Sequence, residues 1–544
     1  MSEQQAPRSL ADVAAAEGPG AAGTPPLQDN LEREIKLTGD PDSLAAVWQA
    51  PSLARRAGRE VLRELETTYY DTADLRLRRR GLALRVRRDG QRFVQTIKTE
   101  NNGQGGLLSR REFSSPVKSS RPELQRVDDA ELRQRIGLIL PAELKPVFTT
   151  RIERKIRKIR AGGPRQPKAL IEVALDQGEV TAKAGRRPIS ELELELLEGS
   201  PDALYDFAVK LNGETPLALE TVTKSERGYA LALGEEAVWV KAEELILKPE
   251  ATLNTALGAI FQTCIRHWLA NHAAVLEGHD PEGVHQLRVA LRRLRSALSV
   301  FKPILPAEDT AWINGEARWL IQSLGPARDW DVFLTELLPP LRSARKGNGD
   351  LETLAAAAED ARRLGYIKAR TALRSARYTT FVLKLGRWIG RAGWRGTEGP
   401  GRFEERVADF ACRLLRKRHK RVLKEGRDFE RLSDEERHRL RITLKKLRYT
   451  AEFFASLYAD DKTRPYLKAL KSLQDELGHL NDVVVAEDLL DSLLGSGDGS
   501  NTAALRAAAG MVVGWYTHGV AVSRPGLEGR WRDFAASEPF WSAA

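Results

Sequence analysis

The stretch LEREIKL (residues 31–37) sets three charged side chains at every second position: Glu32, Glu34 and Lys36. Side chains alternate between the two faces of a β-strand, so these charges share one face, while Ile35 and Leu37 lie on the other. Carboxylates without histidine or cysteine nearby are ligands for hard cations such as Mg²⁺ or Mn²⁺. An edge strand with its polar face in water would show the same pattern, so the rest of the chain must decide between the two interpretations.

Five later segments repeat this alternation with changing sign. Arg85 and Arg87 share one face of LALRVRR (82–88), and Thr96 and Lys98 share one face of FVQTIK (93–98). In SRREF (109–113), Arg110 and Glu112 fall together. Acidic side chains dominate one face of LIEVALDQGEV (170–180) and ISELELELLEG (189–199). An open sheet in water has no need to sort carboxylates and guanidiniums onto separate strands.

Such sorting favours a closed barrel with a polar lumen. Closure removes exposed sheet edges, and the lumen would then hold opposed acidic and basic walls. Arginine grips phosphate oxygens with two parallel donors, so the basic wall suits a phosphate-bearing substrate. We therefore predict an antiparallel β-barrel whose outer apolar faces are covered by helices such as 41–65 and 201–212.

Beyond residue 250 the apolar residues follow a helical period, and one pattern is written twice. HQLRVALRRLRSAL and HRLRITLKKLRYTA carry the same basic stripe at spacings of 3, 4 and 3, 153 positions apart. The stripe residues are His285, Arg288, Arg292 and Arg295 in the first copy and His438, Arg441, Lys445 and Arg448 in the second. An internal duplication is the simplest interpretation, with each copy long enough for about four helices.

A helix face in water needs charged side chains but no particular spacing between them. Stripes that recur in register therefore indicate a surface that binds a ligand. Asp329 and Asp482, also 153 positions apart, would be ion-pair partners that orient the stripes. For His285 and His438, a buried or capping role remains as plausible as contact with a ligand. A zinc site is disfavoured, because no pair of histidines stands at i, i+4 with a carboxylate nearby.

Charge and composition limit the classes of protein to which the chain can belong. Residues 1–240 hold 38 Lys+Arg and 36 Asp+Glu, and residues 241–544 hold 48 and 39, so the net charges are +2 and +9. Cys264 and Cys412 have no CxxC partner and give no disulfide framework. No long apolar run is present, and residues 1–29 are rich in Ala, Gly and Pro. We expect a disordered tail, no membrane span and a cytoplasmic location.

The predicted strands resemble the CYTH superfamily of triphosphate tunnel metalloenzymes. Glu32, Glu34 and Lys36 match its ExExK signature, and the agreement continues through YYDT, LALRVR, TIK, SRREF, FTTRIER, IEVALDQGEV, ELELEL and TKSERGY. The resemblance implies an eight-stranded tunnel over residues 30–235. Its basic residues would hold a triphosphate, and its acidic residues would hold a divalent metal, Mg²⁺ or Mn²⁺.

Carried over to this chain, the resemblance assigns roles to individual residues. The phosphate ligands with catalytic roles would be Lys36, Arg85, Arg87, Lys98, Arg110 and Arg154, and the metal ligands would be Glu32, Glu34, Glu193 and Glu195, with Glu172 and Asp176 facing the same lumen. The register of TTRIERKIR leaves Arg151 as an alternative to Arg154. Relatives of the inorganic-triphosphatase type often have a histidine where this chain has Leu108, which puts any histidine-assisted step in doubt.

The helical part resembles the CHAD domain, a module that often follows a CYTH domain and is associated with inorganic polyphosphate. The resemblance implies all-α bundles over residues 250–540, in repeats of about 250–400 and 403–540, after a linker at 236–249. The polyphosphate ligands would be the eight stripe residues together with Arg293 and Lys446, and both stripes would face one cleft. Nucleic acid is the competing polyanion, but the stripes contain few aromatic residues for base stacking.

These observations predict a multidomain enzyme, an inorganic triphosphatase that cuts tripolyphosphate to pyrophosphate and phosphate and carries a module for long-chain polyphosphate. Polyphosphate granules are a further expected location. Two alternatives stay open: a CYTH enzyme acting on thiamine triphosphate or as an adenylate cyclase, and a non-catalytic granule protein whose barrel only binds. The oligomeric state is left open.

Overall fold

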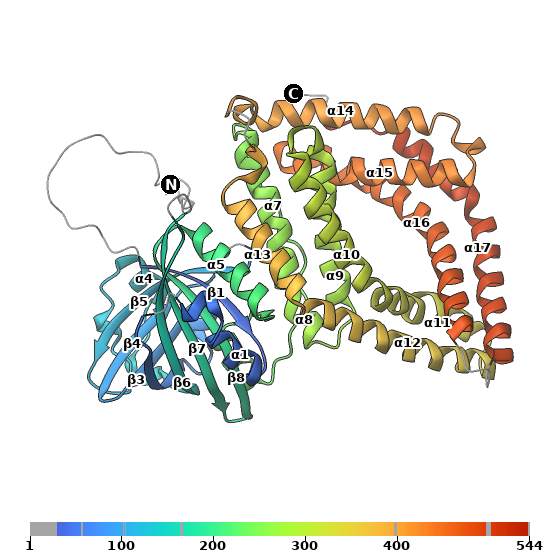
Figure 1. Cartoon of the computed structure of the whole chain (residues 1–544). Helices are drawn as coiled ribbons and strands as arrows, with labels where there is room; N and C mark the ends of the chain where they lie inside the picture. The colour runs from blue at the N-terminus through green and yellow to red at the C-terminus, as the bar shows by residue number, and fades with distance from the viewer. Residues whose placement is uncertain are drawn as a thin grey trace, which may run out of the picture.

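The structure, a computed structural model, describes residues 30–541 except 56–57, 102, 104, 164–166, 397–399 and 497–501. The predicted tail at 1–29 lies outside this range. Figure 1 shows a β-barrel built from the first part of the chain beside an assembly of helices built from the second. Within the described residues we find no helix with the length and apolar character that crossing a bilayer requires.

Eight antiparallel strands close the barrel in the order β5-β4-β3-β2-β6-β7-β8-β1, and β1 pairs again with β5. The strands are β1 (Leu31–Thr38), β2 (Val61–Asp71), β3 (Ala83–Asp89), β4 (Arg92–Lys98), β5 (Leu107–Val117), β6 (Lys145–Ala161), β7 (Ala169–Ala182) and β8 (Gly185–Gly199). A two-residue strand, β9 (Ala218–Leu219), pairs with the end of β1. The predicted antiparallel barrel is confirmed.

The register of the strands sets charged side chains into rows across the lumen. Glu34 of β1 lies opposite Glu195 of β8, and Glu195 lies opposite Glu172 of β7. Arg154 of β6 lies opposite Asp176 of β7. Directly opposite residues have Cβ atoms about 5 Å apart, so each row forces its charges to interact.

Only the first part of the predicted helix 41–65 is helical. The chain forms α1 (Pro41–Trp48) and α2 (Pro51–Ala54), and it then enters β2 at Val61. Pro51 lacks the N–H that a continuing helix would need and instead opens the next helix at its first position. The segment VLRELETTYYD ends in β-branched and aromatic residues and pairs with β3 on one side and β6 on the other.

Helices cover one outer face of the barrel, as predicted. The expected helix at 201–212 is α5 (Pro201–Glu214), which packs with α1 and α2 against β1, β7 and β8. Leu44 and Leu211 of these helices share a buried cluster with Ile35 and Leu192 of the strands. The two short helices α3 (Arg76–Arg79) and α4 (Ala130–Ile136) place Leu77 and Leu132 in a buried cluster with Leu84 of β3.

The second part of the chain is helical and duplicated. Its helices are α7 (Leu253–Ala270), α8 (His272–Leu276), α9 (Glu282–Phe301), α10 (Ala307–Val332), α11 (Leu338–Ala344), α12 (Gly349–Leu373), α13 (Ala376–Gly390), α14 (Val407–Glu425), α15 (Asp434–Phe454), α16 (Asp460–Ser496) and α17 (Thr502–Ala536). Helices α10 and α16 begin 153 residues apart, at Ala307 and Asp460, and so do α12 and α17, at Gly349 and Thr502. The offset of the sequence motifs is thus the offset of the helices.

The two copies meet at equivalent elements. The stripe helices α9 and α15 contact each other, and so do α12 and α17. The segments that precede α7 and α14 form an antiparallel bridge between Thr252 and Arg406. Contacts between equivalent elements indicate a pseudo-twofold relation between the copies.

One hydrophobic core runs through both parts of the chain. Leu217, beside the barrel, and Phe381 of α13 belong to the same buried cluster. The side chain of Asn212 on α5 donates to the Ala376 carbonyl at 2.9 Å, and the Thr379 hydroxyl donates to the Leu217 carbonyl at 2.9 Å. The barrel and the helical part are therefore packed as one body through α5 and α13.

Residues 236–249 cross from the barrel to α7 without regular secondary structure. The Val240 N–H donates to the Asn271 side chain at 3.0 Å, and that side chain donates back to the Val240 carbonyl at 2.9 Å. Farther along, Leu247 is buried and its N–H donates to Ser456 at 2.9 Å. This connecting segment is held along the helical part at both of these points.

Candidate functional site

The lumen of the barrel contains a cavity of about 750 Å³ lined by charged side chains. All six predicted phosphate ligands line it: Lys36, Arg85, Arg87, Lys98, Arg110 and Arg154. Four of the six predicted acidic lumen residues line it as well: Glu32, Glu172, Glu193 and Glu195. Glu34 and Asp176 lie behind this lining and bond to Arg110 and Arg154 respectively. Arg154, and not Arg151, reaches the lumen, because Arg151 is mostly exposed and bonds to Glu66.

One group of lumen charges is balanced around Glu32. Lys98 Nζ lies 2.7 Å from one Glu32 oxygen, and Arg110 Nε lies 2.7 Å from the other. Against the effect of burial, these two cations hold the pKa of Glu32 well below its usual range. Lys98 also pairs with Glu112 at 2.6 Å. Glu32 is therefore ionised and already compensated by the protein.

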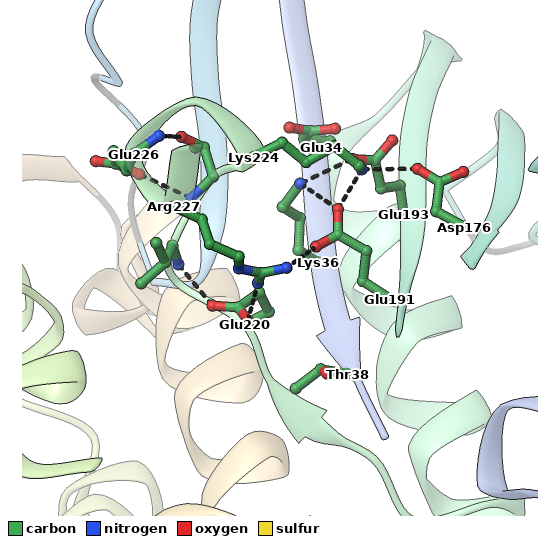
Figure 2. Close-up of polar contacts among 12 residues, drawn as sticks. Glu34, Lys36, Thr38, Asp176, Glu191, Glu193, Glu220, Lys224, Glu226 and Arg227 are labelled. Carbon is green, nitrogen blue, oxygen red and sulfur yellow. Dashed lines mark hydrogen bonds and ion pairs between the residues drawn. The ribbon is translucent and has the colours of Figure 1, made fainter. Parts of the chain in front are cut away.

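A second balanced group contains three carboxylates of β7 and β8 and the lysines that bind them (Figure 2). Asp176, Glu191 and Glu193 have oxygens that all lie within 4.8 Å of one another. Lys36 Nζ lies 2.8 Å from Glu191 and 2.7 Å from Glu193. Lys224 Nζ pairs with all three, at 2.6 Å from Asp176 and 2.7 Å from Glu193. The protein's own ammonium groups thus hold the carboxylates together.

Lys224 is a lumen residue that the sequence analysis missed. It is the first residue of α6 (Lys224–Leu233), and Figure 2 shows its side chain reaching toward the carboxylates of β7 and β8. Thr223 and Glu226 form a capping box that fixes the start of this helix, and Arg227 pairs with Glu220 at 2.7 Å. The TKSERGY segment, which contains Lys224, matched the family pattern. Its T-x-x-E signature predicts only a helix start, so the sequence analysis gave Lys224 no role in the lumen.

A third group is the acidic row of Glu34, Glu195 and Glu172, in which Arg110 pairs with Glu34 and Lys158 lies 3.5 Å from Glu172, while Glu195 stands between them. Burial and the neighbouring carboxylates Glu32 and Glu34 raise the pKa of Glu195 to about 8. Burial, with Glu193 and Glu32, also raises the pKa of Glu34, although Arg110 lies 2.7 Å away. Among the described residues, no lysine or arginine comes within ion-pair distance of Glu195. Uncompensated buried carboxylates are the expected state of a cation site before the cation binds.

The basic wall shows the opposite imbalance at Arg87. Burial and the neighbouring guanidiniums of Arg85 and Arg154 lower the pKa of Arg87 to about 10. Its one hydrogen bond among the described residues is to the neutral Thr67 hydroxyl, at 3.3 Å. Arg85 is 3.9 Å from its nearest carboxylate, Glu112. Tyr69 and Glu112 raise the pKa of Arg85 despite its burial, so the imbalance is confined to Arg87. A buried arginine without a carboxylate partner is suited to an anion such as phosphate.

The residues present therefore fit a hard divalent cation, and they favour one end of the lumen for it. In the row of Glu34, Glu195 and Glu172, Glu195 offers carboxylate oxygens that have no cationic partner among the described residues. Asp176, Glu191 and Glu193 offer similar oxygens, but a cation there would first have to displace Lys224. Of the predicted acidic lumen residues, Glu195 and its row neighbours Glu34 and Glu172 are therefore the best candidates for binding the cation.

The stripe helices α9 and α15 enclose a second cavity, of about 530 Å³. Basic residues from both copies line it, namely His285, Arg292 and Arg293 from α9 and Arg448 from α15. The predicted shared cleft is present, but only part of each stripe reaches it. Among the described lining residues there is no contribution from His438, Arg441, Lys445 or Lys446.

Two stripe arginines of α9 are engaged by the neighbouring helix α10 instead. Arg288 lies 3.7 Å from Asp329 and donates weakly to the Ile321 carbonyl at 3.4 Å. Arg295 donates to Asn314 at 2.8 Å. The expected Arg288–Asp329 pair is thus observed, while the side chain of Asp482 lies outside the described residues.

The two stripe histidines differ in their surroundings. Burial and the positive charge of Arg328 lower the pKa of His285 to about 4, so this ring is neutral near pH 7. His438, its counterpart, is exposed. A neutral imidazole contributes hydrogen bonds but no charge to the cavity between α9 and α15.

Two family models match the chain. One, described as CYTH domain, covers residues 30–229, and the other, described as CHAD domain, covers residues 259–491. Both agree with the resemblances found in the sequence.

Individual proteins are similar over parts of the chain. An inorganic triphosphatase of Haemophilus influenzae is 36% identical over 172 residues, which are 31% of this chain and 46% of that protein, so the match spans about half of that relative. An uncharacterized protein of Mycobacterium tuberculosis is 25% identical over 487 residues, 85% of this chain and 88% of that protein. The crystal structure of the CHAD domain from the plant Ricinus communis has 34% identity and a TM-score of 0.49, and it covers 55% of this chain and 98% of that one.

The Lys224 bridge makes a testable contribution to stability. Lys224→Met leaves three buried carboxylates with less positive charge, so we expect the free energy of unfolding to fall by about 3–5 kcal/mol. Lys210→Met on α5, where the lysine is exposed, is the control and should change stability little. Chemical denaturation of both variants measures the difference. Equal stability of the two would show that the bridge is not needed to hold α6 on the barrel.

Proposed function

Because the chain consists of a CYTH domain followed by a CHAD domain, we propose that it is a metal-dependent inorganic triphosphatase joined to a polyphosphate-binding module. The barrel would hydrolyse tripolyphosphate to pyrophosphate and phosphate, with Mg²⁺ or Mn²⁺ as cofactor. The relative from Haemophilus influenzae, whose name states this activity, supports the proposal over the barrel region.

One observation carries the proposal: the lumen charges balance each other except at two places of opposite sign. Among the described residues, Glu195 has no cationic partner and Arg87 has no carboxylate partner. A polyphosphate with a bound metal ion would supply the cation for Glu195 and the anion for Arg87 in one ligand. A barrel kept only for its structure would have no reason to bury either imbalance.

The residues divide the work by charge. Arg85 and Arg87 would bind phosphate oxygens and stabilise the charge that develops on the leaving pyrophosphate. Glu34 and Glu195 would hold the divalent cation, which when bound neutralises phosphate charge and activates water. Lys98 and Arg110 hold Glu32 in place and keep the basic wall in position beside it. No covalent nucleophile is required.

The lining favours an inorganic substrate over thiamine triphosphate or ATP. Among the described lining residues the aromatic ones are Tyr69 and Tyr229. Both already pack on Phe148, with ring centroids 4.4 Å and 5.3 Å apart. Neither ring is presented for stacking on a base or a thiazole, so an organic triphosphate would gain little from its organic part.

For the helical part we propose binding of long-chain polyphosphate at the cavity between α9 and α15. Arg292, Arg293 and Arg448 come from both copies and converge there. A polyanion that neutralises several arginines releases counterions, so its affinity should fall steeply with salt. A granule protein that only binds remains the second candidate for the whole chain, and measured turnover separates the two.

Phosphate release from a panel of substrates tests the proposed activity. The panel comprises tripolyphosphate, thiamine triphosphate, ATP and long-chain polyphosphate, each with Mg²⁺ and with Mn²⁺. We expect tripolyphosphate to be turned over fastest and the activity to disappear with a chelator. Equal or faster turnover of an organic triphosphate would contradict the inorganic assignment, and no turnover of any substrate would favour the granule protein.

Two barrel substitutions should have different kinetic signatures. Glu34→Gln removes a carboxylate charge at constant volume, so we expect turnover to fall roughly 100-fold or more without loss of fold. Arg87→Ala should instead raise KM by about 10- to 100-fold, with part of the loss recovered at high substrate.

The controls are neighbours that face outward, Glu153→Gln and Arg88→Ala. Steady-state kinetics against substrate and metal concentration, with a melting temperature for each variant, measures the effects. Turnover at the wild-type level in Glu34→Gln would contradict the proposal and would show that the charged strands have only a structural role.

Binding of polyphosphate should depend on the cavity arginines. The triple variant Arg292→Gln, Arg293→Gln and Arg448→Gln should bind labelled long-chain polyphosphate at least ~100-fold more weakly, with a shallower dependence on salt. The control removes three exposed arginines outside the cavity: Arg363→Gln, Arg439→Gln and Arg464→Gln. A similar loss of polyphosphate affinity in both triple variants would show that the helical part is only a generic basic surface. Equally tight binding of duplex DNA of matched charge would show the same.

A further inference from the structure

We propose that helix α13 of the helical part is a positioning element for the active site in the barrel, through a direct glycine contact. This inference rests on the proposed triphosphatase activity. It concerns the hairpin formed by β4 and β5, which reaches from the lumen to the boundary between the two parts of the chain.

The β4–β5 hairpin carries two of the lumen cations. Lys98 ends β4 and Arg110 lies near the start of β5, and both bind Glu32. The connection between them begins with Thr99, Glu100 and Asn101, which line the lumen cavity. A shift of this connection would therefore move the mouth of the cavity and the two cations together.

The end of the same connection rests on the backbone of α13. A Cβ atom placed on Gly386 would lie 2.4 Å from the Gly105 carbonyl oxygen and 2.7 Å from the Gly105 Cα. A Cβ on Gly105 would lie 2.0 Å from the Gly386 Cα, and Gly105 has a φ of +56°. Backbone packs on backbone here, so any side chain at residue 386 must push the hairpin away.

Helix α13 is fixed firmly enough to act as a support. Val382, Leu383 and Leu385 of this helix are fully buried in the core shared with the barrel. Arg387, the residue after Gly386, pairs with Asp206 of α5 at 2.9 Å. The hairpin, and not the helix, is the element that would yield to a clash.

Gly386→Ala tests the contact, and Gly390→Ala is its matched control. Both glycines lie on α13, and both substitutions add one methyl group, but a Cβ at Gly390 meets nothing within 4 Å. We expect kcat/KM for tripolyphosphate to fall about 10- to 100-fold in Gly386→Ala and to stay unchanged in Gly390→Ala. Polyphosphate binding by the helical part should be equal in both variants, which shows that the helices are intact.

Gly105→Ala approaches the contact from the barrel side and should lower kcat/KM in the same direction. If Gly386→Ala and Gly390→Ala have the same kcat/KM in an active wild-type background, the positioning role is wrong while the proposed function stands. Absence of wild-type turnover contradicts the proposed function itself. Loss of both activity and polyphosphate binding in Gly386→Ala alone would show general unfolding and overturn the local account.

A different observation carries a second inference. We infer that the connecting segment at residues 236–249, which we call the strap, opposes polyphosphate binding through its acidic side chains. Glu243 and Glu244 of this segment line the cavity between α9 and α15, in which we propose that polyphosphate binds. Three arginines and four carboxylates line that cavity, since Glu452 and Asp475 contribute as well, so its formal charge is −1. Without the two strap residues it would be +1.

The two glutamates of the strap are exposed between its anchors. Its anchors, at Val240 and Leu247, lie on either side of the two glutamates. Glu243 is exposed and pairs with Arg266 at 3.1 Å, and Glu244 is exposed too. Both side chains can therefore turn away from a longer anion while the backbone of the strap stays anchored.

Glu243→Gln with Glu244→Gln tests the strap in the full-length protein. The control, Glu236→Gln with Glu250→Gln, removes the same charge from two exposed positions at the ends of this segment, outside the cavity; Glu250 directly follows the segment. We expect labelled long-chain polyphosphate to bind about tenfold more tightly to the first variant than to the control at low salt, with the gain shrinking at high salt. Equal affinities would overturn the strap, whereas a wild type that binds no polyphosphate would contradict the proposed function of the helical part.

Discussion

The structure depends on ion pairs between the charged side chains inside the narrow lumen of the barrel. Charged groups taken out of water are costly unless they are paired, and eight strands here place both signs inside one cavity. Lys36 and Lys224 bind Asp176, Glu191 and Glu193, and Lys98 and Arg110 bind Glu32. Because Lys224 comes from α6, the same ion pairs that balance the lumen also fasten that helix to the barrel. The remaining imbalance, at Glu195 and at Arg87, then marks where a cation and an anion belong.

The helical part is joined to the barrel by more than a connecting segment. A shared core, with α5 packed on α13, makes the barrel and the helices one body. The β4–β5 hairpin touches α13 at Gly386, and the segment after the barrel reaches the cavity between the stripe helices. Both routes connect the place where a triphosphate would be cut with the place where a longer polyphosphate would be held.

Much of the barrel could be predicted because alternation is a local signal. The ExExK stretch and the later alternating segments identified most of the lumen side chains and their faces. The prediction failed for β2, where residues 61–65 were included in a helix, because that strand is defined by its pairing with β3 and β6. Lys224 was missed for a related reason, since only the fold brings the start of α6 into the lumen. In the helical part the stripe spacing was right, but the sequence could not show that α10 engages Arg288 and Arg295.

The central claim is that uncompensated lumen charge marks the ligand site. The most direct measurement is a crystal structure of the full-length protein with Mn²⁺ and a non-hydrolysable triphosphate, in which anomalous scattering locates the metal. The account predicts a manganese peak beside Glu34 and Glu195, triphosphate oxygens on Arg85 and Arg87, and Lys224 still bonded to its three carboxylates. A peak among Asp176, Glu191 and Glu193 with Lys224 displaced, or a triphosphate bound outside the lumen, would contradict it.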